Sequence, residues 1–189
     1  MKTVDEIIDD VVLVEGGYND IAEDKGGATK YGISLRYAKG IGLDLDEDGD
    51  VDKDDIQLVD LETAKRCFKR DFLIEPRINI LPEEILPQVF DCSVNHGPPQ
   101  AIRFIQQVCI KADFMPEIDN RGRPNADGVM GPATRLAAEQ ALEEMGPFFH
   151  NAIVEERVNF YQRIVQRDPS QNKFLKGWLK RARSFEVVT

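Results

Sequence analysis

The stretch from Val14 to Ser34 holds the residue types that acid–base chemistry needs, and it reads VEGGYNDIAEDKGGATKYGIS. Glu15 stands at the end of an apolar helical run and precedes a pair of glycines. A carboxylic acid at the negative end of a helix dipole, beside apolar neighbours, is expected to have a raised pKa. An acid that stays protonated near neutral pH can protonate a leaving group, so Glu15 is the candidate general acid.

Glycoside hydrolysis also needs a second carboxylate that stays ionised, either as a nucleophile or as the base for a water molecule. Asp20, Glu23 and Asp24 lie in the loop after the glycine pair, and Asp24 stands nine residues after Glu15. Thr29 could position the water. On spacing alone, an ordinary exposed acid at a helix end followed by a solvated acidic loop remains an open alternative.

The helix that must hold Glu15 in place is predicted from Thr3 to about Val14. Thr3 and Glu6 have the spacing of a capping box, in which each side chain bonds the backbone amide of the other residue. Gly16 stands just past the last periodic residue, where glycine commonly ends a helix. The apolar positions recur at helical spacing and predict one buried face: Val4, Ile7, Ile8, Val11 and Val12.

The segment resembles the N-terminal signature of glycoside hydrolase family 108, which comprises peptidoglycan-cleaving muramidases of phages and bacteria. The two glycine-containing parts of that signature match Glu15, Gly16, Gly17 and Tyr18, then Gly26, Gly27, Ala28, Thr29, Tyr31, Gly32 and Ile33. The resemblance continues in order along the chain, at 89–97 with Ala101 and Gln106, at 127–134, at Arg157, Phe160 and Tyr161, and at 177–181. It therefore covers nearly the whole sequence.

This resemblance implies cleavage of the bond between N-acetylmuramic acid and N-acetylglucosamine, with Glu15 as the acid. Related phage lysozymes place an Asp about nine residues after the acid and a Thr about six residues further on. Asp24 and Thr29 nearly match this spacing, with the second gap one residue short, so Asp20 stays as a rival to Asp24. Tyr31, in the same signature, is a candidate substrate-binding residue.

Asp91 and Asn95 lie one helical turn apart in another part of the signature. They are candidates for sugar binding, and a structural polar network is an equally open reading. Cys92 and His96 lie in the same turn and could suggest a cysteine peptidase. No second element is predicted to orient the histidine, so this alternative has little support.

A second cluster of carboxylates lies at 44–55 and reads DLDEDGDVDKDD. These twelve residues contain eight acids and one lysine, so they carry −7 of the net charge of −10. Asp44, Asp46 and Asp48 occupy positions 1, 3 and 5 of an EF-hand loop, a glycine stands at position 6, and Asp50 offers its carbonyl at position 7. Asp55 at position 12 completes the pattern.

The loop departs from the usual EF-hand at position 12, where Asp55 replaces glutamate and resembles the dockerin type. A shorter carboxylate binds less easily through both oxygens, which leaves the affinity open. The alternative is a solvated acidic loop, but unpaired acids at this density repel one another. Because a single loop is present, we expect a structural Ca²⁺ close to the cleft rather than a calcium sensor, and no cofactor for the chemistry.

The fold class predicted from composition and pattern is α+β, predominantly helical, as a single lysozyme-like domain over 1–189. At 189 residues with 42% hydrophobic content, the chain can bury one sizeable core. A small β element is expected at 29–35, and the residues from about 97 onward form a helical part with peptidoglycan-binding-like features. Proline and Asp60 mark the predicted helices: 60–72, 82–95, one from Pro98 or Pro99 to about 112, 132–145, 147–167 and a last one that follows Pro169 and ends at about 183, with a loop at 115–127.

Charge and cysteine content suggest the compartment. The first ten residues carry four acids and no basic segment before an apolar run, so we expect no signal peptide. Cys67, Cys92 and Cys109 lack metal-site spacing and are expected to be free, buried thiols in a reducing cytoplasm. For an endolysin, the resemblance implies release to the cell wall or periplasm through holin lesions.

The sequence therefore predicts a peptidoglycan hydrolase of the muramidase type that acts as a monomer on bacterial peptidoglycan, with no nucleic-acid partner. The basic C-terminal helix could make weak contact with the anionic envelope. Two alternatives stay open. A wall-binding module or secretion activator would keep the fold without hydrolysis, and a lytic transglycosylase would need the acid but not the second carboxylate.

Overall fold

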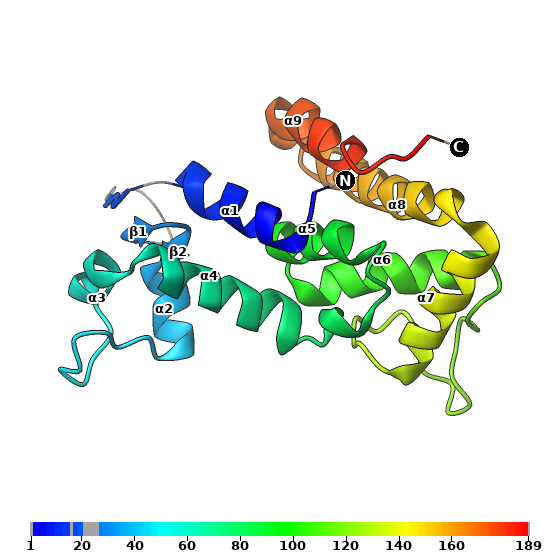
Figure 1. Ribbon diagram of the computed structural model, residues 1–189. Coiled ribbons are helices and arrows are strands. Elements are labelled where there is room, and N and C mark those ends of the chain that lie inside the picture. The colour runs from blue at the N-terminus through cyan, green and yellow to red at the C-terminus, as the bar shows by residue number, and fades with distance from the viewer. Residues whose placement is uncertain (1, 16, 21–26, 189) are drawn as a thin grey trace. The chain divides into compact units, whose positions relative to one another are not determined.

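The computed structural model describes residues 2–15, 17–20 and 27–188, without the side chains of 13–15 (Figure 1). The chain forms two compact units, Lys2–Asp71 and Phe72–Thr189, which are called the N-terminal and C-terminal units below. The described parts are predominantly helical with one small antiparallel sheet, so the predicted α+β class is confirmed. The prediction that the whole chain is a single domain stays a prediction.

The N-terminal unit contains the only sheet among the described residues. Its elements are α1 (Val4–Glu15), β1 (Thr29–Lys30), β2 (Ile33–Ser34), α2 (Leu35–Ile41), α3 (Lys53–Leu58) and α4 (Leu61–Lys69). A π-helical turn, η1 (Arg70–Ile74), leads out of the unit. Helices α2 and α3 were not predicted, because each is shorter than the window over which helical periodicity is legible.

Helix α1 begins as predicted. The backbone N–H of Thr3 donates to Glu6 Oε2 at 2.7 Å, and the N–H of Glu6 donates to Thr3 Oγ1 at 3.2 Å. This reciprocal capping box satisfies amides that have no partner inside the helix. Ile7, Ile8 and Val12 are buried, and the helix packs against α4. The predicted helix and its buried face are confirmed.

The small β element predicted at 29–35 is confirmed as a two-stranded antiparallel hairpin. Lys30 pairs with Ile33, and the two residues between them, Tyr31 and Gly32, have φ of 51° and 77°. Two successive positive φ values are the signature of a type I′ turn, whose twist matches that of the paired strands. Ser34 then caps α2 by accepting the amide of Tyr37 at 3.2 Å, so the chain turns helical where the sequence still reads as a strand.

The C-terminal unit is built of helices. It contains η2 (Ile78–Ile80), α5 (Leu86–His96), α6 (Pro98–Lys111), α7 (Pro132–Met145), α8 (Pro147–Arg167), η3 (Pro169–Gln171) and α9 (Asn172–Arg183). Helix α6 packs against α5, α7 and α8, and its buried face includes Phe104 and Ile105. The helices predicted to start at the prolines of α6, α7 and α8 are confirmed.

One of the predicted helix starts is wrong. Helix α5 begins at Leu86 rather than at Pro82, because Pro87 lacks an amide hydrogen and is accommodated only in the first helical turn. Residues 82–85 form a turn instead, in which the amide of Leu86 donates to the carbonyl of Pro82 at 3.2 Å. The last helix follows Pro169, as predicted, with a 3₁₀ turn before α9 begins at Asn172.

The long connection between α6 and α7 is irregular, as predicted, with an isolated bridge between Ile118 and Pro124. Its end is fixed by Gln106 on α6. The Gln106 side chain donates to Asp127 Oδ1 at 2.9 Å and to Thr134 Oγ1 at 3.1 Å, and it accepts the amide of Gly128 at 2.9 Å. A Cβ at Gly128 would lie 2.7 Å from a backbone oxygen, so glycine is required there.

No helix in the described part of the chain is long and apolar enough to cross a membrane. The three cysteines are free and buried, as predicted.

Candidate active site and acidic loop

The candidate acid, Glu15, is the last residue of α1. This is the position that the sequence predicted, where a helix fixed by its buried face gives way to the glycine-containing segment. The side chain of Glu15 and all of Asp24 lie outside the described residues. Their roles as general acid and second carboxylate stay predictions.

Thr29 lies in β1, where backbone bonds hold it on both sides. Its amide and carbonyl exchange 2.8 Å hydrogen bonds with Asn19, and Thr29 is also the register partner of Ser34. Its hydroxyl donates to the carbonyl of Gly27 at 3.3 Å. The strand therefore fixes the half-buried Thr29 relative to the segment that follows Glu15.

Tyr31 occupies the hairpin turn with φ of 51°. Bulky side chains rarely adopt positive φ, and a non-glycine residue held there costs on the order of 1–3 kcal/mol. The ring is only half-buried, with the Lys30 ammonium 5.7 Å from its centroid. Burial in the core therefore does not account for a tyrosine in this strained position.

Asp20, the rival for the second carboxylate, forms an ion pair with Lys53 at 2.7 Å. Its carboxylate is the main cause that raises the pKa of Lys53. Sequence reasoning missed Lys53, although it is the one basic residue in the acidic loop. Both partners are partly exposed, so water and salt screen this pair and it acts only as a local tether.

A second tether joins β1 of the hairpin to α3. The Lys30 ammonium donates to the carbonyl of Gln57 at 2.5 Å, and β1 packs against α3. Because α3 begins at position 10 of the acidic loop, the loop is connected through α3 to the hairpin that carries Thr29 and Tyr31.

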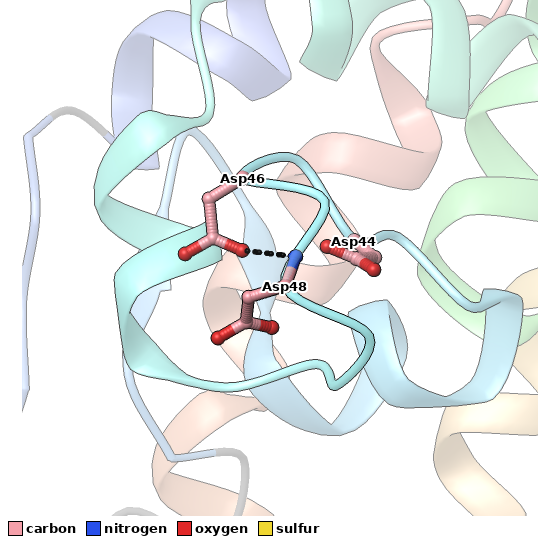
Figure 2. A group of neighbouring side chains, drawn as sticks. All are labelled: Asp44, Asp46 and Asp48. Carbon is pink, nitrogen blue, oxygen red and sulfur yellow. Dashed lines mark hydrogen bonds between the residues drawn. The ribbon is translucent and has the colours of Figure 1, made fainter.

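The acidic loop brings three of its predicted ligands together. Asp44, Asp46 and Asp48 each offer one carboxylate oxygen, and these oxygens lie within 4.8 Å of one another (Figure 2). The amide of Asp48 donates to Asp46 Oδ1 at 3.3 Å, and the amide of Gly49 donates to Asp44 Oδ2 at 3.1 Å. These bonds curl the loop around its own carboxylates.

Asp55 lies at the base of the loop and is 1% exposed. Its Oδ1 accepts the amide of Leu45 at 2.5 Å, and its Oδ2 accepts the amide of Asp52 at 2.8 Å. Burial opposes ionisation, but these backbone hydrogen bonds outweigh it and lower the pKa of Asp55. Asp55 therefore joins the two ends of the loop and is not one of the three clustered carboxylates.

The loop fits a hard divalent cation on two observations. Asp44 Oδ1 is buried and has no hydrogen-bond partner in the described chain, which is costly for a carboxylate oxygen unless a ligand satisfies it. The second observation is that the carboxylates repel one another. Repulsion from Asp48 is the largest cause that raises the pKa of Asp50. Asp50 itself lies outside the cluster, and the sequence predicted it to contribute its carbonyl. Calcium binding stays a prediction.

Asp91 and Asn95 lie in the C-terminal unit. Asp91 Oδ2 lies 2.6 Å from the buried Arg157, and its Oδ1 accepts two bonds from Arg181 at 2.9 and 2.8 Å. Asn95 is exposed and donates to the carbonyl of Asp91 at 2.7 Å. One carboxylate thus joins α5, α8 and α9, which is the polar network that the sequence left open, and sugar binding by these two residues stays a prediction.

Cys92 and His96 do not form a thiolate–imidazolium pair. Burial raises the pKa of the Cys92 thiol to about 11, and burial together with Arg157 lowers the pKa of His96 to about 4. Near neutral pH the thiol is protonated and the imidazole is neutral, the reverse of what an activated cysteine requires. The cysteine-peptidase alternative therefore gains no support from this site.

Comparison with known proteins divides the chain in two. Residues 8–97 match the family model described as glycosyl hydrolase 108, and residues 100–183 match the model described as a predicted peptidoglycan domain. No curated protein matches the chain. Among solved structures, SagA of Brucella abortus is similar over 97% of this chain and 91% of that chain, with 22% sequence identity and a TM-score of 0.68.

The structural likeness confirms the fold, and the family matches support a glycoside hydrolase with a role in peptidoglycan hydrolysis or cell-wall binding. The first match ends at Gly97, between α5 and α6, and the second begins at Gln100 within α6. Glu15, Asp24, Thr29 and Tyr31 all fall inside the glycosyl hydrolase match.

Proposed function

We propose that the protein is an N-acetylmuramidase of the lysozyme type, which cleaves peptidoglycan between N-acetylmuramic acid and N-acetylglucosamine. The observation that carries this proposal is the glycosyl hydrolase match over residues 8–97, with Glu15 at the end of α1. The adjoining peptidoglycan match supports the choice of substrate.

In the proposed mechanism, Glu15 donates its proton to the glycosidic oxygen as the bond from that oxygen to the sugar C1 breaks. Asp24 stays ionised and either attacks C1 itself or takes a proton from the water that attacks. Hydrolysis adds the hydrogen and hydroxyl of one water across the cleaved bond. Thr29, held in β1 between two backbone partners, supplies the hydroxyl that positions this water.

Tyr31 is proposed to bind the glycan. A strained backbone often marks a position retained for function, since the surrounding structure must hold it in place. The half-buried ring at the tip of the hairpin offers an apolar face to a sugar and a hydroxyl that can bond to it.

Two other readings share much of this evidence. A non-hydrolytic wall-binding module or secretion activator would rely on the peptidoglycan match alone, and the intact Glu15 argues against it. A lytic transglycosylase would use Glu15 without a second carboxylate and would release an anhydro sugar instead of a free reducing end.

Mass spectrometry of the products from purified peptidoglycan tests all three. The expected products have a free reducing end at N-acetylmuramic acid, and Glu15→Gln should reduce their formation about 100-fold or more, since glutamine cannot donate the proton. Circular dichroism should show that the variant is folded. Anhydro products would favour the transglycosylase. Release by a folded Glu15→Gln variant at the wild-type rate would contradict the mechanism.

We also propose that the loop at 44–55 binds one structural Ca²⁺. Asp44, Asp46 and Asp48 would supply side-chain oxygens, Asp50 its carbonyl, and Asp55 the position-12 carboxylate. The unsatisfied Asp44 Oδ1 and the clustering of three carboxylates support this proposal. When bound, the ion neutralises the carboxylates that otherwise repel one another. The chemistry at Glu15 needs no Lewis acid.

The proposed setting is that of a phage endolysin, made in the cytoplasm and released to the wall through holin lesions. The enzyme is proposed to act as a monomer on bacterial peptidoglycan and not on nucleic acid.

A further inference from the structure

Helix α9 concentrates positive charge in a protein whose net charge is −10. It contains five basic residues and no acidic residue. Two of the five are neutralised within the unit: Arg181 binds Asp91 at 2.8 Å, and Arg183 binds Glu186. The other three form no ion pair in the described part of the chain, and all three are exposed: Lys173, Lys176 and Lys180.

These three lysines form a stripe along one side of the helix. Their spacing of three and four residues places them within one face, since a helix turns once in 3.6 residues. Gly177 lies beside them, and an added Cβ there would meet nothing within 4 Å. Phe174 borders the stripe with 47% of its surface exposed, and the Lys173 ammonium lies 4.9 Å from the centre of its ring.

The other side of α9 is packed against α8 (Figure 1). Ala182 is fully buried, and the indole of Trp178 stacks on the buried Tyr161 with centroids 5.1 Å apart. Phe174 stacks in turn on Trp178 at 5.8 Å, so its ring continues an aromatic series from the core to the surface. This packing holds the lysine stripe and Phe174 in a fixed position facing outward.

We propose that the stripe of Lys173, Lys176 and Lys180, with Phe174, binds the anionic peptidoglycan strand. The lysines would pair with carboxylates of the stem peptides, and the ring would pack on the apolar C–H face of a sugar. This inference rests on the proposed function for the substrate, and it adds a second contact surface away from the residues that cut the glycan.

An anionic membrane surface fits these observations less well. A helix that lies in a membrane interface buries an apolar face in lipid. The apolar face of α9 is already used in packing against α8, and Phe174 is the only large apolar side chain of the helix that is exposed. Charge pairing with a polyanion needs no such free face.

The test is co-sedimentation of the full chain with sacculi stripped of accessory polymers, using Glu15→Gln so that the glycan is not cut. The triple variant Lys173→Gln, Lys176→Gln, Lys180→Gln should bind about 10-fold more weakly, which corresponds to roughly 1.4 kcal/mol. The triple variant Arg36→Gln, Lys39→Gln, Arg121→Gln has the same change in net charge, at exposed positions for which the described residues provide no ion pair, and should bind as before.

Two further arms sharpen the result. Phe174→Ala should weaken binding at high salt as well as low, whereas the lysine contribution should fade as salt screens it. Circular dichroism checks that each variant is folded. Equal binding by the two triple variants would overturn the proposal, as would a lysine-dependent preference for phosphatidylglycerol vesicles over sacculi. Product analysis of the wild type does not depend on these binding measurements. If the wild type releases muramidase products and the two triple variants bind equally, the binding surface on α9 is refuted and the proposed function stands.

Discussion

At the scale of single residues, Tyr31 presents a conflict between backbone and side chain. The type I′ turn favours asparagine or glycine, yet a tyrosine is held there at a φ of 51°. The ring is only half-buried, so burial in the core does not explain this strain, and a role with substrate is the explanation that we propose.

Tyr31→Asn should therefore separate stability from activity. Asparagine tolerates positive φ, so the free energy of unfolding should stay unchanged or rise by about 1 kcal/mol. Turnover of peptidoglycan should fall, mainly through a higher KM, because the ring is lost. Urea unfolding and initial rates measure the two effects. Tyr31→Phe is the control that keeps the ring, and a Tyr31→Asn variant with the KM of the wild type would refute the binding role.

The two candidate carboxylates can be distinguished by mutation. Asp20 is tied to Lys53 at 2.7 Å in a partly exposed ion pair. Asp20→Asn should lose only this tether, with an activity change of a few-fold, since such pairs contribute about 0–1 kcal/mol. Asp24→Asn should lose much more activity, because it removes the proposed second carboxylate. Rates of sacculus clearance at equal protein concentration compare the variants, and the reverse order of effects would transfer the role to Asp20.

At the scale of elements, the acidic loop and the hairpin are joined through α3. Lys53 binds Asp20, and Lys30 binds the carbonyl of Gln57. A cation that fixed the loop would therefore also hold in place the hairpin carrying Thr29.

Calcium should raise the melting temperature. At 100 times its dissociation constant, an ion that binds only the folded state adds about 2.7 kcal/mol, which corresponds to several degrees for a domain of this size. Hydrogen exchange at the amides of Asn19 and Thr29 should slow with it, because these amides bond each other's carbonyls. The Asp44→Ala, Asp46→Ala variant should show neither change. A wild-type melt that is the same in calcium and in chelator would reduce the segment to a solvated acidic loop.

At the scale of the whole molecule, the family boundary and the structural boundary differ. The glycosyl hydrolase match ends at Gly97, but α5 belongs to the unit that begins at Phe72. The buried Asp91 of α5 pairs with Arg157, which lies in the region of the peptidoglycan match. In a fragment that ends at Gly97, the Asp91 carboxylate would lack its arginine partners. We therefore expect the two matched regions to depend on each other for folding.

Charge is also divided unevenly. Lys2–Asp71 contains 19 acidic and 10 basic residues, whereas Phe72–Thr189 contains 15 and 14. Nearly all of the net negative charge therefore lies in the N-terminal unit, much of it in the acidic loop. The unpaired lysines of α9 lie in the unit that is close to neutral, where they are best able to attract an anionic polymer.

The C-terminal unit should lose stability in mild acid. Burial and Arg157 lower the pKa of His96 to about 4, with Arg181 acting in the same direction and Asp91 against it. In the unfolded chain its pKa is near 6.5, so between these values the unfolded state binds more protons and stability rises with pH. Full stability is expected above about pH 6.5, with roughly 2–3 kcal/mol lost as pH falls to about 4.

Urea unfolding of wild type and His96→Phe across this range measures the effect. Phenylalanine suits the site, where the imidazole packs edge-on against Phe104 and Phe160, and it cannot take up a proton. The free energy of unfolding of the variant should depend less on pH. A smaller pH dependence should remain because burial also lowers the pKa of His150. Parallel curves for the two proteins would contradict this account.

The sequence by itself determined the features that depend on local chemistry. The capping box of Thr3 and Glu6, the cap at Asp60 and the helices that begin at Pro98, Pro132 and Pro147 follow from backbone groups that only nearby residues can satisfy. The EF-hand spacing likewise placed three carboxylates in one cluster, because all three lie within five residues of each other.

Tertiary structure alone decided which distant charges meet. That Asp91 is shared by Arg157 and Arg181, and that Asp20 is tied to Lys53, depends on how separate elements pack, which no local pattern encodes. Local sequence patterns reflect the hydrogen bonds that one element needs for its own backbone. A long-range ion pair depends on which of many possible partners lies close in the packed structure, and the sequence pattern does not specify this.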